Sequence, residues 1–358
     1  MMNDETLIRR IEAARVRTLQ WLDSMQLANG ASRISPAHDP ERWPGMLLPG
    51  TYNAVMCRDL LDAPVQNADL AAWLLSHRRA DGVFRVPGMT DDTVFKRPEP
   101  GETWGYIDFH VTNYSLGAMQ AVAPGEAPLL DFARWFLDPM MLKAWLADRD
   151  LRDPWLEGNN IVNLASFLLL LGADGALEIL LRWHAYHQDP ATGFWGVGQS
   201  SDATRLLHAM AGSMHNFHIW YRLGRTLPYQ DRAADYALSR PTGIDTACID
   251  VDLVDLLVHA RMCLGYRTAD IHAWLREKLL ALLDFQSADG GFADEMSGIR
   301  RQDGWVRGYQ EPQGLSNTFA TWFRWIAIAM IADELWPDRW AWRFRKMIGI
   351  GYRMERTP

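Results

Sequence analysis

The sequence has few cysteines and no long apolar run. Its 358 residues include three cysteines and no Cys-x-x-Cys motif, which excludes a disulfide scaffold and a cysteine-rich zinc module. The longest apolar run, residues 161–173, contains Asn163 and Ser166 and is too short and too polar to span a bilayer. The first 26 residues have helical spacing and lack the apolar region of a signal peptide. We therefore expect a cytoplasmic protein without a transmembrane segment.

Clustered positive charge is also lacking. The chain has 36 Lys and Arg against 44 Asp and Glu, a net charge of −8, and no long basic cluster. We therefore expect no nucleic-acid partner. Hydrophobic residues make up 48%, which is typical of a globular protein with an ample core. The 17 tryptophans are far above ordinary usage, so we expect large rings to line a site as well as to fill the core.

Segments of alternating polar and apolar residues, the mark of β-strands, are absent as well. Almost every periodic segment has the spacing of a helix instead, which predicts an all-α protein. The expected helices cover roughly 5–26, 51–61, 67–77, 108–122, 128–147, 158–172, 174–188, 204–223, 229–239, 248–264, 268–286, 315–335 and 337–348.

A glycine–aromatic motif recurs along the chain at multiples of about 50 residues. It reads Gln-x3-Gly-x-Phe over 286–292, and related copies begin at residues 26, 78 and 188. Glycine suits the positive φ at a helix end, so the motif predicts helical hairpins, with two degenerate copies near 130 and 238. Six hairpins bury their apolar faces best by closing into a ring. The sequence thus predicts an (α/α)6 toroid with a central cavity, as one domain over 1–358 with a C-terminal helix.

The repeat resembles that of the squalene–hopene cyclases and, more loosely, that of the β subunits of protein prenyltransferases. The resemblance covers the chain as an architecture. It implies a toroid whose site lies in the central cavity, at one mouth. It does not by itself imply a reaction, which must be argued from the site.

The second helix of each hairpin is expected to line the cavity, and five of these helices carry polar residues near their starts. A buried helix is normally apolar unless water or a ligand meets it, although Asn and Glu at a helix start are also usual caps. A buried Arg needs an anion, either a ligand or a carboxylate of a neighbouring helix. The candidates for substrate contact are His110, Asn113, Glu157, Asn160, Asn163, Asp250, Asn317 and Arg324, with Trp220 and Trp305 as aromatic wall.

Two carboxylates lie one turn apart on the fifth inner helix. Asp252, Asp255 and His259 fall on one helix face, and carboxylates this close compete to stay ionised, so one pKa should rise. A carboxyl group with a raised pKa is a usable general acid. Asp250-Val-Asp252 resembles the start of the DxDD motif of class II terpene cyclases, and this resemblance implies that Asp252 protonates an alkene. The alternative is that Asp250 caps the helix, Asp252 meets the helix dipole and Asp255 pairs with His259.

The fourth inner helix carries His215 and His218 on one stripe, which makes them catalytic candidates beside Asp252 and Asp255. Their spacing of three residues is a weak pattern for metal ligation, and the zinc ligands of the prenyltransferases are not reproduced. We therefore expect no metal and no cofactor. The segment 294–313 is long, charged and aromatic, and is a candidate lid.

Three hypotheses about function remain open. The first is a class II-like cyclase that acts on an isoprenoid, in which aromatic faces stabilise the cation. The second is a lyase, epimerase or glycosidase that acts on an acidic oligosaccharide or polysaccharide through the His, Asn and Arg side chains. The third is a non-catalytic binding protein built on a degenerate toroid. The sequence does not predict an oligomeric state.

Overall fold

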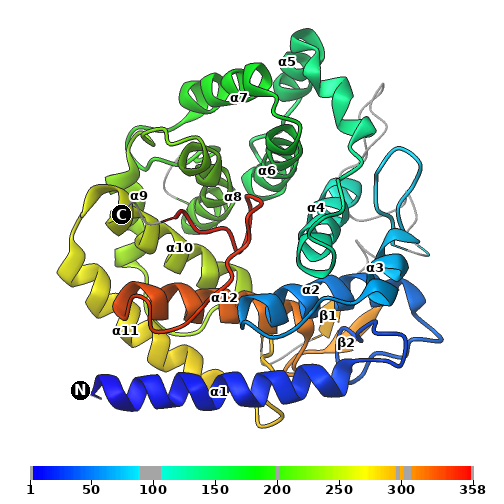
Figure 1. The fold of residues 1–358 in the computed structure, drawn as a ribbon. Helices are drawn as coiled ribbons and strands as arrows, with labels where there is room; N and C mark the ends of the chain where they lie inside the picture. Colours follow the sequence, from blue (N-terminus) through cyan, green and yellow to red (C-terminus); the bar gives the residue numbers. More distant parts are fainter. Residues whose placement is uncertain are drawn as a thin grey trace.

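A computed structural model describes residues 3–86, 88, 106–198, 202–295, 299–301, 306 and 308–355. Within these residues the chain forms an (α/α)6 toroid, as expected (Figure 1). The inner helices are α2 (Leu47–Leu60), α4 (Tyr106–Val122), α6 (Pro154–Leu170), α8 (Ala203–Arg222), α10 (Ala247–Leu264) and α12 (Thr318–Leu335). The outer helices are α1 (Asp4–Met25), α3 (Ala68–Leu75), α5 (Pro139–Ala147), α7 (Asp174–His187), α9 (Gln230–Ser239) and α11 (Thr268–Phe285).

The ring closes because each inner helix packs on the next. Contacts run from α2 through α4, α6, α8 and α10 to α12, and α12 returns to α2. An inner helix is therefore covered on almost every side, and α10 and α12 are accordingly buried over most of their length. Short elements complete the described chain: the 3-10 helices η1 (Pro44–Met46) and η2 (Asp131–Leu137), and the antiparallel strands β1 (Ile299–Arg301) and β2 (Gln310–Pro312).

The glycine motif lies where an outer helix ends and turns toward its inner partner. Gly30, Gly193 and Gly290 have φ angles of 84°, 78° and 100°, which favour glycine. The glutamine that follows the helix closes the turn: the Nε2 atoms of Gln188 and Gln286 each donate to the carbonyl oxygen of that glycine at 2.8 Å. The copy expected near 130 is misplaced, because Pro139 divides that segment into η2 and α5, and α5 ends at Ala147.

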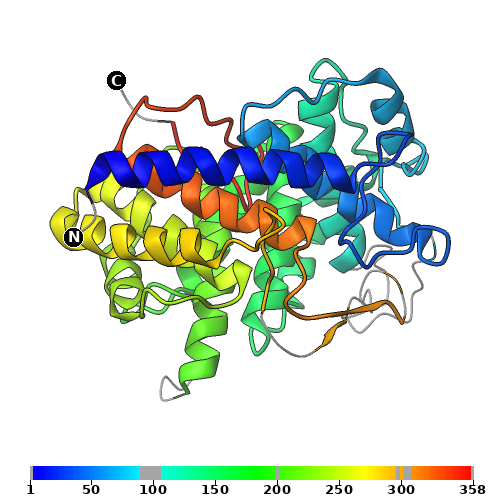
Figure 2. The same ribbon diagram turned by 90° about the horizontal axis from the view of Figure 1, so that it is seen from below.

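The C-terminal helix predicted over 337–348 is wrong. Pro337 follows α12, and Asp338 takes a left-handed φ of 62°, so no helix continues there. The chain instead turns back at Gly349 and Gly351, whose φ angles are 102° and 87°. Figure 1 shows this red segment running into the centre of the ring, and Figure 2 places it on the face opposite the projecting first turns of α8.

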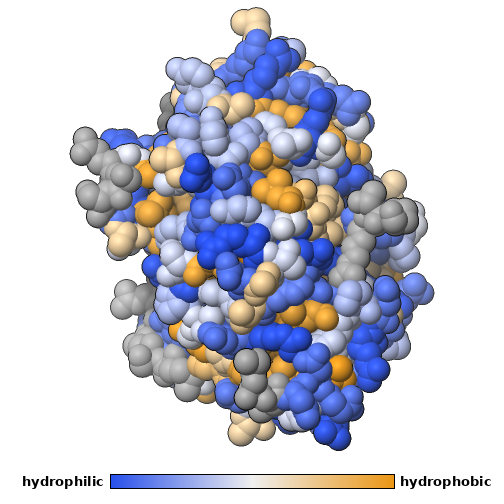
Figure 3. Space-filling model, turned by 90° about the vertical axis from the view of Figure 1, so that its left-hand side faces the viewer, coloured by the Kyte–Doolittle hydropathy of each residue, from blue (hydrophilic) through white to orange (hydrophobic). Residues whose placement is uncertain are grey.

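The outer surface is mainly hydrophilic where Figure 3 shows it. On that face hydrophobic residues form small separate groups between polar ones. Among the helices of the described residues, none combines the length and the apolar character that crossing a bilayer requires.

Candidate functional site

Asp252 on α10 lies at the start of a chain of hydrogen bonds that crosses to α8 and α6. Its Oδ1 atom is 3.3 Å from Nε2 of His215, and Nδ1 of His215 is 3.0 Å from Oδ1 of Asn159. Asp252 is fully buried, and its Oδ2 atom has no hydrogen-bond partner among the described residues. Burial raises the pKa of Asp252 to about 6, against the opposing charge and hydrogen bond of His215.

The position of one proton follows from this chain of contacts. The Nδ2 atom of Asn159 donates to the Trp155 carbonyl oxygen, so the Oδ1 atom of Asn159 accepts and Nδ1 of His215 carries a hydrogen. The other nitrogen, Nε2, faces Oδ1 of Asp252, and the contact between these two atoms holds one proton. A proton on Oδ2 is separate from this contact, because Oδ2 has no hydrogen-bond partner among the described residues. Asp252 can therefore be a carboxylic acid at Oδ2 while Oδ1 remains bonded to His215.

Two glycines allow α6 and α8 to approach closely enough for the Asn159–His215 contact. A Cβ atom on Gly158 would lie 2.4 Å from the Gly212 carbonyl oxygen, and one on Gly212 would lie 2.0 Å from the Pro154 carbonyl oxygen. Asn216 stabilises the crossing, because its Nδ2 atom donates to the carbonyl oxygens of both Gly158 and Gly212. Backbone contact between the helices therefore positions His215 beside Asp252.

We expect Gly212→Ala to lower the free energy of unfolding by about 1–3 kcal/mol, because the added methyl group must push α6 and α8 apart. Urea denaturation measures this loss. Gly175→Ala on α7 is the matched control: a Cβ there meets nothing within 4 Å. The control should be neutral or stabilise by up to about 1 kcal/mol through helix propensity. Equal stabilities of the two variants would contradict the close crossing.

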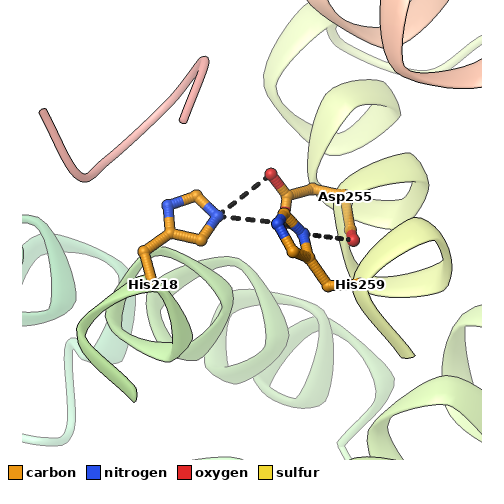
Figure 4. Close-up of side chains that lie close together, drawn as sticks. All are labelled: His218, Asp255 and His259. Carbon is orange, nitrogen blue, oxygen red and sulfur yellow. Dashed lines mark hydrogen bonds and ion pairs between the residues drawn. The ribbon is translucent and has the colours of Figure 1, made fainter. Parts of the chain in front are cut away.

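A second cluster lies one turn further along α10, where Asp255 contacts two imidazoles (Figure 4). His218 Nε2 lies 3.0 Å from each carboxylate oxygen, and His259 Nδ1 lies 2.8 Å from Oδ1. Burial acts to raise the pKa of Asp255, but the interactions with His218 and His259 outweigh it and hold this pKa well below its ordinary value. The two carboxyl groups of α10 therefore differ: Asp252 holds a proton more readily, and Asp255 stays ionised.

The ligand atoms of His218, Asp255 and His259 lie within 4.8 Å of one another, so the cluster must be tested as a metal site. The outer nitrogens of both imidazoles accept backbone N–H groups, Nδ1 of His218 from Gly349 and Nε2 of His259 from Met354. A metal-bound neutral imidazole carries a hydrogen on its outer nitrogen and needs an acceptor there. Both rings face donors instead. The residues do not fit a metal ion while the C-terminal segment occupies this position.

Asp250 and Arg324, both predicted to contact substrate, contact each other. The guanidinium of Arg324 and the ammonium of Lys278 on α11 both pair with the Asp250 carboxylate, and all three side chains are fully buried. Arg324 also donates to the carbonyl oxygens of Ala293, Asp245 and Asp294. Burial raises the pKa of Asp250, against the two cations. This ion group ties α10, α11 and α12 together.

The remaining polar candidates also have protein partners. Glu157 accepts from Arg149 at 3.2 Å and from Asn160 at 3.1 Å. The Nδ2 atom of Asn113 donates to Oδ1 of Asn163 at 2.6 Å. Asn317 caps α12 by accepting from the Ala320 N–H. Trp220 on α8 is 8% exposed, whereas Trp305 lies outside the described residues, as does part of the candidate lid 294–313.

A group of buried rings on α2, α4 and α12 includes His110. His110 stacks on Tyr114 with centroids 4.2 Å apart, and Tyr114 lies 5.5 Å from both Tyr52 and Trp322. Burial, with Arg345 and then His215, lowers the pKa of His110 to about 3, so its ring is neutral. His215, the partner of Asp252, is thus among the groups that act on His110. Cys248, one turn before Asp252, likewise acts on Tyr106 and Tyr114.

Several of these residues were not predicted from the sequence. Asn159 was not predicted because its neighbour Asn160 was the candidate, although a helical wheel places the two residues on different faces of α6. Lys278 and Arg149 lie on outer elements, and their partners follow only from the packing. Arg345 comes from the segment that was expected to be helical, and its Nη2 atom donates to the carbonyl oxygen and the Oδ1 atom of Asn113.

No protein-family model matches the chain, and no curated protein matches it in sequence. Solved structures do match. The type II terpene cyclase MstE from Scytonema, a variant in complex with geranylgeranyl dihydroxybenzoate (substrate), has a TM-score of 0.51 and 12% identity over 92% of this chain and 99% of that chain. A second MstE variant with the same substrate gives 0.50 and 12%, and an apo variant gives 0.50 and 11%, each over 93% of this chain. At these identities the likeness shows the fold alone.

Proposed function

We propose that this chain catalyses the protonation-initiated cyclisation of an isoprenoid, with Asp252 as the acid. The observation that carries the proposal is the buried Oδ2 atom of Asp252, which has no hydrogen-bond partner among the described residues. Its other oxygen is held by His215. A proton on Oδ2 therefore has no protein acceptor there and is free to pass to a substrate.

The chemistry needs only an acid and a protected cation. The Asp252 Oδ2–H bond breaks as the π electrons of an alkene form a new C–H bond. The second alkene carbon becomes a carbocation, and a neighbouring double bond attacks it to close a ring. Loss of a proton from the product cation restores the charge balance. His215 stabilises the carboxylate that Asp252 leaves behind, because its Nε2 atom lies 3.3 Å from Oδ1.

The ring group around His110 supports this chemistry. Tyr52, Tyr114 and Trp322 are the aromatic rings packed beside it, and the face of an aromatic ring attracts a cation by about 0.5–2 kcal/mol. His110 is held neutral by burial, so it adds no repelling charge. The site thus combines a buried acid with an aromatic wall.

The similar structures support the same reaction class. MstE is a type II terpene cyclase, and it was solved with a geranylgeranyl substrate. This chain covers 99% of its length, so one toroid of this size is sufficient for such an enzyme. We therefore propose a small isoprenoid as the substrate.

The oligosaccharide hypothesis receives less support. It relies on six side chains to meet a polar substrate, and each of them is hydrogen-bonded to another side chain: Asn160, Asn163, His215, His218, Tyr221 and Arg324. A sugar would have to compete with these buried partners. An assay with polyprenyl substrates separates the cyclase from the other two hypotheses, because a chain that converts none of them is not a cyclase.

The reaction should have an acidic pH optimum. The acid must be protonated, and the pKa of Asp252 is about 6, so turnover should be constant at lower pH and fall about tenfold per pH unit above it. Product formation from a panel of polyprenyl substrates, measured from about pH 5 to about pH 8, tests this. Turnover that rises through this range would indicate a base and would contradict the proposal.

A further inference from the structure

The C-terminal segment 345–354 closes one end of the ring and is held there by packing and by polar contacts. A Cβ atom on Gly351 would lie 3.2 Å from Trp322 and 3.3 Å from Ile326, so the backbone runs against α12. Arg345 reaches α4, where it bonds Asn113 and lies 5.2 Å from the Tyr114 ring. The segment is thus built into the interior rather than lying on the surface (Figure 1).

Two of the polar contacts are made to imidazoles. The Gly349 N–H donates to Nδ1 of His218 at 3.3 Å, and the Met354 N–H donates to Nε2 of His259 at 3.2 Å. The remaining nitrogen of each ring faces the Asp255 carboxylate (Figure 4). Each ring therefore needs a lone pair toward the segment and a hydrogen toward Asp255. Only the neutral imidazole has both.

The surroundings of His218 favour the neutral form of its ring. Asp255 on α10 is the carboxylate that contacts the two imidazoles, and it acts to raise the pKa of His218, but burial outweighs it and lowers that pKa. His259 and then His215 on α8 act on the pKa of His218 in the same direction as burial. Tyr221 on α8 stacks on His259 at 4.5 Å.

The remaining ring comes from the segment itself. The ring centroids of Tyr352 and His218 lie 5.2 Å apart. Burial raises the pKa of Tyr352 to about 12; Arg222 acts to lower this pKa and Glu355 acts to raise it. Burial also raises the pKa of Tyr221 far above its ordinary value. Both phenols therefore stay uncharged. Among the described residues, Asp255 supplies the negative charge that contacts the imidazoles of His218 and His259.

We propose that the C-terminal segment is a pH-sensitive latch, docked while His218 and His259 are neutral and released when either ring gains a proton. A protonated imidazole carries hydrogens on both nitrogens. Its outer N–H then points at the backbone N–H of Gly349 or Met354, so a hydrogen bond is replaced by two opposed donors. The latch goes beyond the proposed reaction and does not depend on it.

The direction of the pH dependence follows from linkage. When the segment is released and water reaches the His218 ring, the ordinary imidazole pKa of about 6.5 applies, and in the docked state burial lowers the pKa of His218. Docking is therefore at full strength above about pH 6.5 and weakens as the pH falls below it. One linked proton changes the docking equilibrium by up to about tenfold per pH unit, and two by up to about a hundredfold.

Hydrogen exchange of the full chain, followed by mass spectrometry, tests the latch without any ligand. The amides of 345–354 should be protected near pH 8 and should open about 10- to 100-fold more often for each pH unit below about 6.5, after correction for intrinsic exchange. The amides of α6 should show no such change. Equal protection of the segment at about pH 8 and about pH 5 would overturn the proposal.

The variant His218→Asn/His259→Gln removes the titration but keeps an amide oxygen at the position of each accepting nitrogen. Provided that it melts cooperatively at neutral pH, its segment should stay protected in acid. His184→Gln is the control, because His184 is buried on α7 against Trp183 and Trp195, away from the segment. It should open like the wild type. A double variant that opens in acid as much as the control would overturn the assignment to these two histidines.

Discussion

Asp252→Asn should leave a folded protein that has lost turnover of its polyprenyl substrate by about 10²–10⁴-fold, the usual contribution of general acid catalysis. Asparagine keeps the shape, and its amide can donate to Nε2 of a neutral His215 or accept from a protonated one, so the contact that now measures 3.3 Å can be retained. It cannot deliver a proton to an alkene. Product analysis of wild type and variant measures the loss, and thermal unfolding checks the fold.

Asp255→Asn is the matched control on the same helix. Both oxygens of Asp255 lie 3.0 Å from His218 Nε2, so this carboxylate offers no free oxygen to a substrate. The control should lose stability but still form product. An Asp252→Asn variant with full activity would remove this residue from the mechanism, and a wild type that cyclises no polyprenyl substrate would remove the cyclase reaction itself.

Asp250→Asn should lower the free energy of unfolding by about 3–5 kcal/mol, the usual loss when one partner of a buried ion pair is removed. The change leaves the Lys278 and Arg324 cations buried, with 0% side-chain exposure, and without their shared carboxylate. Urea denaturation at neutral pH gives the value. This prediction separates a structural role from the substrate contact first inferred from the sequence.

The control for this experiment is Asp284→Asn, which breaks a surface ion pair with Arg10. The side chain of Asp284 is 70% exposed and that of Arg10 is 29% exposed. Such pairs contribute about 0–1 kcal/mol, so the control should be nearly neutral. If Asp250→Asn is as stable as the control but binds substrate more weakly, Asp250 is a binding residue and the ion group is not what ties α10 to α12.

The ring of hairpins could be predicted because its signals are local. Glycine–aromatic turns such as Gly193 and Gly290 mark where an outer helix ends, and their spacing gives the length of a hairpin. The C-terminal segment could not be predicted in this way. Residues 337–348 have helical spacing, but Asp338 takes a left-handed conformation and the apolar side chains pack on helices distant in sequence.

The pairing of Asp252 with Asp255 on one helix face was also predictable, as was a raised pKa for one of them. The resemblance to the DxDD motif pointed to Asp252 as the residue with the raised pKa, but the helix pattern alone did not decide between the two, because the pKa of each depends on partners from α8. His218 and His259 both contact Asp255, whereas His215 alone contacts Asp252. The Asp255–His259 pair lies within α10 and follows from its spacing of four residues. The contacts of His215 and His218 depend on the crossing of α6 and α8 at two glycines, which no pattern within α10 reports.

Closure of the ring also has a consequence for biosynthesis. α12 packs between α10 and α2, and Trp325 on α12 donates to Thr18 on α1 at 2.8 Å, across 307 residues of sequence. The inner helix of the first hairpin, α2, is therefore fully covered only after α12 of the last hairpin has folded against it. During translation α2 leaves the ribosome long before α12, with an apolar face exposed, and contacts of such sequence separation form slowly. A nascent chain of this fold needs protection from aggregation until its final helix has emerged.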